Sequence, residues 1–210
     1  MGYLHSATRV PARCHPGRAV RGASVVREFK ALEGVWAGRI RAPGQPSKSN
    51  DGFTICQAVF IRSLRSLLEM PLLTNAKPGQ IALLLNAYWE GIAKVLPEPF
   101  HPAVNPQSYV IQKEQGATVL HSVLPQVIEV IPSWGRSLAD VIAYADIMHD
   151  LPTLSGEIMT VHGVELVSGA GFWLSGSAGV ASQFSGDAGR ERLAAEVRTL
   201  IPRPAAGLEL

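Results

Sequence analysis

The side chains best suited to acid–base chemistry in this sequence are six histidines, which are scattered without any paired spacing. Only His149 has an acid directly beside it, Asp150, which would orient the imidazole as a general base. A surface position at the end of a helix is the competing interpretation of that pair. His121 lies between apolar residues, which favours a packed or hydrogen-bonded side chain over a catalytic one. The six are His5, His15, His101, His121, His149 and His162.

Sequence motifs for nucleophilic or metal-assisted catalysis are absent. The two cysteines, Cys14 and Cys56, form neither a disulfide framework nor a CxxC pair, and Cys56 falls within a predicted helix. HExxH, GxSxG, EF-hand and kinase signatures are missing, and no carboxylates are paired locally for acid–base work. The sequence therefore predicts no catalytic residue, no cofactor and no metal, and it argues against an enzyme without excluding one.

A glycine-rich segment, Ser168 to Gly179, has two interpretations. The backbone amides of such a turn can cradle an anion where the turn opens onto a helix. Against this, the segment lacks the lysine of a GxxxxGK[ST] loop and is not GxGxxG. The alternative, which the sequence favours, is a flexible turn that allows Phe172 and Trp173 to pack into the core.

Cationic side chains suggest a nucleic-acid partner. Residues 1–50 carry nine Lys or Arg against two acidic residues, whereas the remainder of the chain is acidic overall. Arg62 and Arg65, one helical turn apart, could grip a phosphate, and Lys113 is the third candidate contact. A solvated helix face is the alternative for the two arginines.

The basic N-terminal arm also has more than one interpretation. It could contact nucleic acid through phosphates, but no aromatic residues interleave with its arginines to stack on bases, so a disordered leader is favoured. Its Arg-rich, acid-poor composition also resembles an organelle transit peptide.

The most clearly encoded element is a helix from Pro78 to Leu96. Pro78 suits a first helical turn, Pro97 cannot continue the helix, and Glu90 with Lys94 forms an i,i+4 pair on the polar side. The apolar residues fall on one stripe at helical spacing. They are Ile81, Leu84, Leu85, Tyr88, Trp89, Ile92, Val95 and Leu96.

Other segments show weaker helical patterns. Thr54 with Gln57 matches a capping box and begins a helix that stops at Pro71. From Ala117 to Ile131 the apolar spacing is helical, but Pro125 would cost about 3 kcal/mol in a helix interior. We therefore expect two short helices there, with Pro125 opening the second.

Toward the C-terminus, Ser137 resembles an N-cap for a helix that ends near Asp150. Residues 157–167 are ambiguous, because their β-branched residues favour a strand while the spacing also permits a frayed helix. A last helix covers residues 188–200 and ends at Pro202.

These elements predict a mainly α fold, an irregular bundle of about five to six helices with a disordered basic N-terminal arm and room for one short strand pair. The predicted parts are the arm (1–49), a helical domain (50–202) and a loose tail (203–210). No stretch approaches the roughly 18 apolar residues of a spanning helix, and the N-terminus lacks the apolar core of a secretory signal. We therefore expect a cytoplasmic protein with no membrane partner.

Several groups of residues, taken in order, resemble the C-terminal part of the DGQHR-domain proteins. In that family the order begins with a helix that starts at an acidic residue followed by glycine. An aromatic helix with an NxxW-type motif comes next and is followed by Pro-Glu. An extended segment with lysine and glycine then leads to an apolar helix. The residues are Asp51 to Gln57, Leu85 to Trp89 with Pro97-Glu98, Tyr109 to Lys113 leading to Gly116, Leu120 and Leu124, and Phe172-Trp173 with Ser175 to Gly179.

The resemblance implies a bacterial or phage protein related to a partition-protein-type nuclease fold and to regulators of DNA sulfur modification. The family's signature loop, Asp-Gly-Gln-His-Arg, is absent, because the only Asp-Gly here, Asp51-Gly52, is followed by Phe53. None of the family's functional residues can therefore be assigned to this chain.

Two functions follow as hypotheses. The first is a truncated or degenerate DGQHR-domain-like protein, a DNA-associated accessory of a modification or defence system, in which the basic arm, Arg62, Arg65 and Lys113 meet phosphates. The alternative is a non-catalytic helical module that binds a protein partner through exposed apolar surface.

Overall fold

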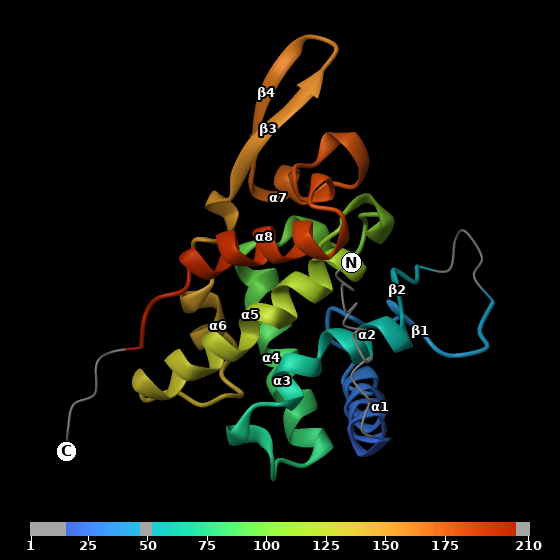
Figure 1. The fold of residues 1–210 in the computed structure, drawn as a ribbon, viewed down its shortest axis with the longest axis vertical. Helices are drawn as coiled ribbons and strands as arrows, with labels where there is room; N and C mark the ends of the chain where they lie inside the picture. Colours follow the sequence, from blue (N-terminus) through green and yellow to red (C-terminus); the bar gives the residue numbers. More distant parts are fainter. Residues whose placement is uncertain (1–15, 47–51, 205–210) are drawn as a thin grey trace, which may run out of the picture.

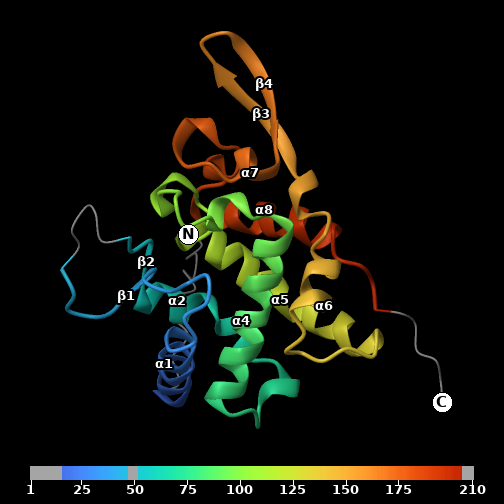
Figure 2. The same ribbon diagram turned by 180° about the vertical axis from the view of Figure 1, so that it is seen from behind.

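The centre of the fold is a pair of long helices, α4 (Pro78–Val95) and α5 (Glu114–Ser133). The computed structural model describes residues 16–46 and 52–204 of the chain. Shorter helices surround the central pair, as Figure 1 and the reverse view in Figure 2 show. α1 (Pro16–Lys30) and α6 (Val141–Ile147) pack on α4, whereas α2 (Gln57–Ser63), α3 (Arg65–Leu68) and α8 (Gly186–Thr199) pack on α5. The predicted mainly α fold is confirmed.

α4 forms as its apolar spacing predicts, beginning at Pro78 and ending one residue before Leu96. The predicted stripe points into the core, where Tyr88 and Trp89 are fully buried. On the polar side, the carboxylate of Glu90 accepts a hydrogen bond from the backbone N–H of Val35 at 3.2 Å. Glu90 therefore ties α4 to the segment that follows α1.

α5 is one continuous helix, so the prediction that Pro125 would open a second helix was wrong. Because proline has no N–H, the carbonyl of His121 loses its usual helical donor. The hydroxyl of Ser66 donates to that carbonyl at 3.3 Å, and the hydroxyl of Tyr88 donates to the carbonyl of Leu120 at 2.9 Å. The apolar residues on both sides of the proline are fully buried. At about 1.5–3 kcal/mol for each large side chain, this burial outweighs the cost of the proline.

Residues 16–46 are folded against the rest of the chain, although we expected from the sequence that they would belong to a disordered leader. α1 buries Val25 and Phe29, and the Phe29 ring stacks on Phe60 of α2 with centroids 5.6 Å apart. The prediction failed because Arg and Gly residues interrupt the apolar pattern of α1. This helix is stabilised by its packing against the rest of the fold rather than by the helix propensity of its residues. Residues 1–15 lie outside the described residues.

The start of α2 also differs from the prediction. α2 begins at Gln57 with Cys56 as its N-cap, so the expected Thr54 capping box is not used. Cys56 belongs instead to a short strand, and the hydroxyl of Thr54 donates to the carbonyl of Gln112 at 2.6 Å. Thr54 therefore joins this strand to the segment before α5.

The N-cap of α6 is Asp140 rather than the predicted Ser137. Its carboxylate accepts hydrogen bonds from the backbone N–H groups of Ile142, at 2.9 Å, and Ala143. The Arg136 guanidinium, hydrogen-bonded to the carboxylate at 3.0 Å, lowers the pKa of Asp140, and these backbone N–H bonds lower it further. A charged cap of this kind stabilises the first turn of a helix.

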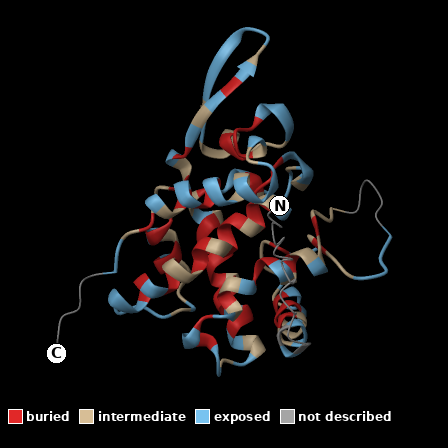
Figure 3. Ribbon diagram, in the orientation of Figure 1, coloured by how far each residue is buried: buried red, intermediate tan, exposed pale blue. Residues whose placement is uncertain are grey.

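The described residues contain two strand pairs where the sequence left room for one. β1 (Ile40–Arg41) and β2 (Ile55–Cys56) pair in parallel, and β3 (Ser155–Thr160) and β4 (Gly163–Ser168) form an antiparallel hairpin. The hairpin settles the ambiguous segment 157–167 as strand. It projects beyond the helices at one end of the longest axis, and most of it is exposed (Figures 1 and 3).

Short helical turns complete the described chain. The last helix predicted from the sequence is confirmed as α8. The proline-rich connection after α4 is irregular, as expected, and contains two 3-10 turns. Residues 205–210 of the predicted tail lie outside the described residues. The short turns are α7 (Gly169–Phe172), η1 (Pro71–Leu73), η2 (Glu98–Phe100), η3 (Pro106–Ser108), η4 (Leu151–Thr153), η5 (Gly176–Ala178) and η6 (Ala181–Gln183).

Candidate functional site

Lys113, a predicted nucleic-acid contact, has its ammonium group occupied within the fold. Its Nζ donates to the carbonyl of Gln107 at 2.6 Å and to the Ser175 hydroxyl oxygen at 2.9 Å. The hydroxyl of Ser175 donates to the same carbonyl at 2.9 Å. We call these three residues the Lys113 clamp. Burial lowers the pKa of Lys113.

The Lys113 clamp holds two distant loops together. Beside it, Val110 N–H donates to the carbonyl of Trp173, and Ser175 N–H donates to the carbonyl of Ser108, both at 2.8 Å. A lysine next to a serine is also an arrangement found in hydrolases, where the lysine takes the hydroxyl proton. Here the ammonium and the hydroxyl converge on one backbone carbonyl, so the geometry is that of a structural tie.

Arg62 and Arg65 remain on the surface, but the structure does not join them to Lys113 in one site. Both arginines are exposed, and Arg65 pairs with Glu69 at 3.1 Å. The neighbouring Ser66 contacts α5 at His121, which is eight residues beyond Lys113. At 1.5 Å per residue, that separation is about 12 Å along the helix. The two arginines are therefore a separate surface feature.

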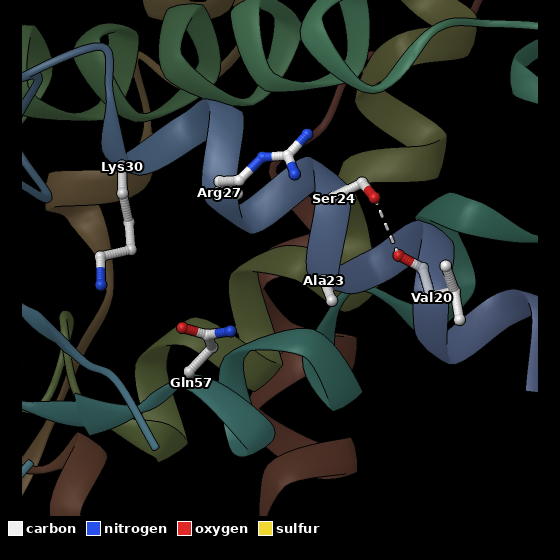
Figure 4. A pocket seen from close by; sticks show the side chains of 6 residues that line it. All are labelled: Val20, Ala23, Ser24, Arg27, Lys30 and Gln57. Carbon is white, nitrogen blue, oxygen red and sulfur yellow. Dashed lines mark hydrogen bonds between the residues drawn. The ribbon is translucent and has the colours of Figure 1, made fainter. Parts of the chain in front are cut away.

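A shallow groove with cationic side chains lies between α1 and the start of α2, and Figure 4 shows it from close by. Its volume is about 470 Å³. Arg27 pairs with Glu28 at 2.9 Å and is well exposed, as is Lys30. This groove was not predicted from the sequence, because residues 16–30 were expected to belong to a disordered leader. The lining residues are Val20, Ala23, Ser24, Arg27, Lys30 and Gln57.

The predicted pair of His149 and Asp150 forms on the surface. His149 Nε2 lies 3.2 Å from the Asp150 carboxylate, and Nδ1 lies 2.7 Å from the carbonyl of Asp146. Both ring nitrogens therefore face acceptors, and neither is left to take a proton from a substrate. The pair lacks the arrangement of a general base with its orienting acid.

His121 is fully buried and lies in a hydrogen-bonded chain. The indole N–H of Trp89 donates to Nε2 at 3.0 Å, so the ring proton must be on Nδ1. Nδ1–H then donates to the Ser63 hydroxyl oxygen at 2.7 Å, and that hydroxyl donates to the carbonyl of Phe60 at 2.8 Å. Burial lowers the pKa of His121 to about 3, so the imidazole is neutral. The expected packed, hydrogen-bonded role is confirmed.

The glycine-rich segment serves packing. Phe172 and Trp173 are fully buried, as the favoured interpretation predicted. A Cβ on Gly179 would lie 1.9 Å from the carbonyl oxygen of Leu174, so the close approach of the two backbones requires glycine. The segment packs against the base of the hairpin, because its helix α7 contacts both β3 and β4.

The outward face of the β3–β4 hairpin carries large apolar side chains that are exposed to solvent. Met159 and Val164 are paired across the strands, and Leu166 is paired with Glu157 on the same face. The exposed fractions are 75% for Met159, 60% for Val164 and 72% for Leu166, and Val161 at the tip is 96% exposed. We call these four apolar side chains the hairpin face.

The opposite face of the hairpin packs on the body. Ile158 is buried, and a Cβ on Gly156 would lie 2.6 Å from Val180 Cγ1. The hairpin face was not predicted from the sequence, because apolar residues in a strand usually mark the core. Alternation with a period of two could have placed Met159, Val164 and Leu166 together, but not shown that they stay uncovered.

Within residues 16–46 and 52–204, no group of three or more His, Cys, Asp or Glu could hold a metal ion. In the same part of the chain, no helix combines the length and the apolar character needed to cross a membrane. When the chain was compared with protein-family models, curated proteins and solved structures, none of them matched it.

Proposed function

We propose that this protein is a non-catalytic helical interaction module that binds a protein partner through its β3–β4 hairpin. The observation that supports the proposal is the hairpin face, in which four large apolar side chains are each at least 60% exposed. Contiguous exposed apolar surface marks protein–protein contacts in soluble proteins. A projecting hairpin also offers strand edges to which a partner strand can add.

The polar groups that could have suggested catalysis have structural partners instead. His121 bonds to Trp89 and Ser63, and Lys113 bonds to Gln107 and Ser175. These bonds use the donors and acceptors that a reacting substrate would need. Binding by the hairpin requires no such group.

Site-specific photocrosslinking tests the proposal. A photoreactive amino acid replaces Leu166 on the hairpin face, and the matched control carries it at Glu196, an exposed position on α8. In a lysate of the source cells, we expect a defined protein adduct from position 166 only. The adduct should be lost when Met159→Glu is added. Equal crosslinking from both positions, or none from position 166, would contradict the proposal.

A second proposal is the DNA-associated accessory that the DGQHR resemblance implies. The observation that favours it is the exposure of Arg27 and Lys30 on α1 and of Arg62 on α2, because α1 and α2 are packed together. Exposed cations on adjacent helices can contact successive phosphates.

Salt-dependent binding to duplex DNA tests this second proposal. Across about 50 to 200 mM salt, log K should fall linearly with log salt concentration, and the slope should decrease by about 1 for each phosphate contact removed. Arg62→Glu or Lys30→Glu should therefore reduce both affinity and slope. Lys94→Glu, which removes the same charge from the exposed side of α4, is the control. Binding that is unchanged by the first two variants would eliminate the proposal.

A further inference from the structure

A second apolar surface lies at the end of the molecule opposite the hairpin. It is a groove of about 510 Å³ between η1, the first turns of α4 and the turn before α6. Leu72 and Leu83 on its walls are 59% and 51% exposed. Figures 1 and 2 place the hairpin and the η1–α4 region at opposite ends of the longest axis. The groove is lined by Leu72, Leu73, Asn75, Ala76, Gln80, Leu83, Leu84, Ser137, Leu138 and Ala139.

The charges at the two ends are complementary. The sequence has no Lys or Arg between Arg136 and Arg190, and Glu157, paired with Leu166, places a carboxylate on the hairpin face. Beside the groove, Lys77 is exposed at the N-cap of α4.

Other charged groups border the groove as well. The Arg21 guanidinium donates to the carbonyls of Leu73 and Ala76, which belong to the groove. Arg136 on the far side contacts two carboxylates, Asp140 at 3.0 Å and Asp146 at 3.5 Å, so that side is acidic by one charge. Positive charge therefore lies on the η1–α4 side of the groove, where Arg21 and Lys77 are found.

We infer that the partner of the hairpin is a second copy of this chain, whose η1–α4 groove receives the hairpin face. The inference rests on the proposed function, that the hairpin binds protein. A projecting apolar surface meets a concave one, and the Glu157 carboxylate on the hairpin face approaches Lys77 and Arg21 of the next copy. Because the two surfaces differ, each copy still offers a free hairpin or a free groove, so the contact builds head-to-tail chains or a closed ring.

Sedimentation of the full chain over a range of concentrations tests this inference. The mass should rise above the 22.5 kDa of one chain as concentration increases. Leu166→Glu damages only the hairpin face, and Leu83→Glu damages only the groove. Each variant alone should associate roughly 30-fold or more weakly than wild type, the loss typical of a central interface residue. Val20→Glu, at a 67% exposed apolar position outside both surfaces, should leave the association unchanged.

Mixing the two variants gives the decisive measurement. Leu166→Glu retains an intact groove and Leu83→Glu retains an intact hairpin, so the mixture should form a one-to-one dimer that cannot grow. Circular dichroism should show that both variants fold, because Leu166 and Leu83 are exposed. A wild type that stays monomeric, or a mixture that stays monomeric, would overturn the inference.

Two outcomes separate this inference from the proposed function. If Leu83→Glu associates like wild type while Leu166→Glu does not, the hairpin binds protein but not at the groove, and only the inference fails. If Leu166→Glu associates like wild type, and position 166 also gives no specific crosslink, both fail.

Discussion

Acidification should destabilise the fold through His121. Burial lowers its pKa to about 3, whereas in the unfolded chain it has the ordinary value of 6.5. The unfolded state therefore binds a proton that the folded state does not, and stability that is complete above the unfolded pKa is lost as the pH falls toward the folded pKa. Each pH unit in this window costs up to about 1.4 kcal/mol. Between about pH 7 and pH 5 the free energy of unfolding should fall by about 2 kcal/mol.

Urea denaturation followed by circular dichroism at the two pH values measures this change. The control is His121→Gln, whose amide can accept from Trp89 and donate to Ser63 but does not titrate. Its stability should be nearly constant over the same interval, whatever its starting value. Asp140, whose pKa is lowered from 3.8, contributes only at lower pH. A loss of about 2 kcal/mol that persists in His121→Gln would refute the assignment to His121.

Three further substitutions test the packing and the hydrogen bonds. Ser63→Ala leaves the buried Nδ1–H of His121 without its acceptor, and urea denaturation should show a loss of about 1–3 kcal/mol. Gly91→Ala should lower the free energy of unfolding by about 1–3 kcal/mol, because the new Cβ would lie 2.6 Å from a Cβ on α6. Gly79→Ala, in open space on the same helix, should not lower it. Lys113→Met should speed hydrogen exchange of the amides in the clamped loops about tenfold, and unchanged exchange would argue against the clamp.

The sequence predicts a helix correctly where the apolar residues of that helix lie at helical spacing along one face. α4 and α8 show apolar residues at helical spacing next to proline boundaries, and both form within a few residues of the predicted limits. α1 could not be predicted in the same way, because its apolar residues are few and find their partners on α2 and α4. The prediction at Pro125 was wrong because helix propensity includes the loss of the proline N–H. It does not include the replacement hydrogen bond from the hydroxyl of Ser66, which is distant in sequence.

The candidate sites depend on contacts between distant residues, which the sequence does not reveal. Ser63 and Trp89 reach His121 from positions 58 and 32 residues away. Apolar residues in 157–167 could equally belong to a core strand. Their exposure follows from the fact that only one side of the hairpin meets the body, through Gly156 against Val180. Sequence patterns can place residues on one face, but the covering of that face is a property of the whole fold.

The Lys113 clamp helps to fix the base of the hairpin, which links this polar cluster to the proposed binding surface. Lys113 and Gln115 at the start of α5 hold the loop that follows the hairpin, the latter through the carbonyls of Ala181 and Phe184. Gln183 in that loop bonds back to the carbonyl of Glu157 in β3 at 3.4 Å. A hairpin held in this way has little freedom to lose when it meets a partner, and pre-organisation of this kind raises affinity without any new contact. Lys113 and Ser175, a pair of the kind found in hydrolases, are therefore better understood as support for the hairpin that we propose binds a partner.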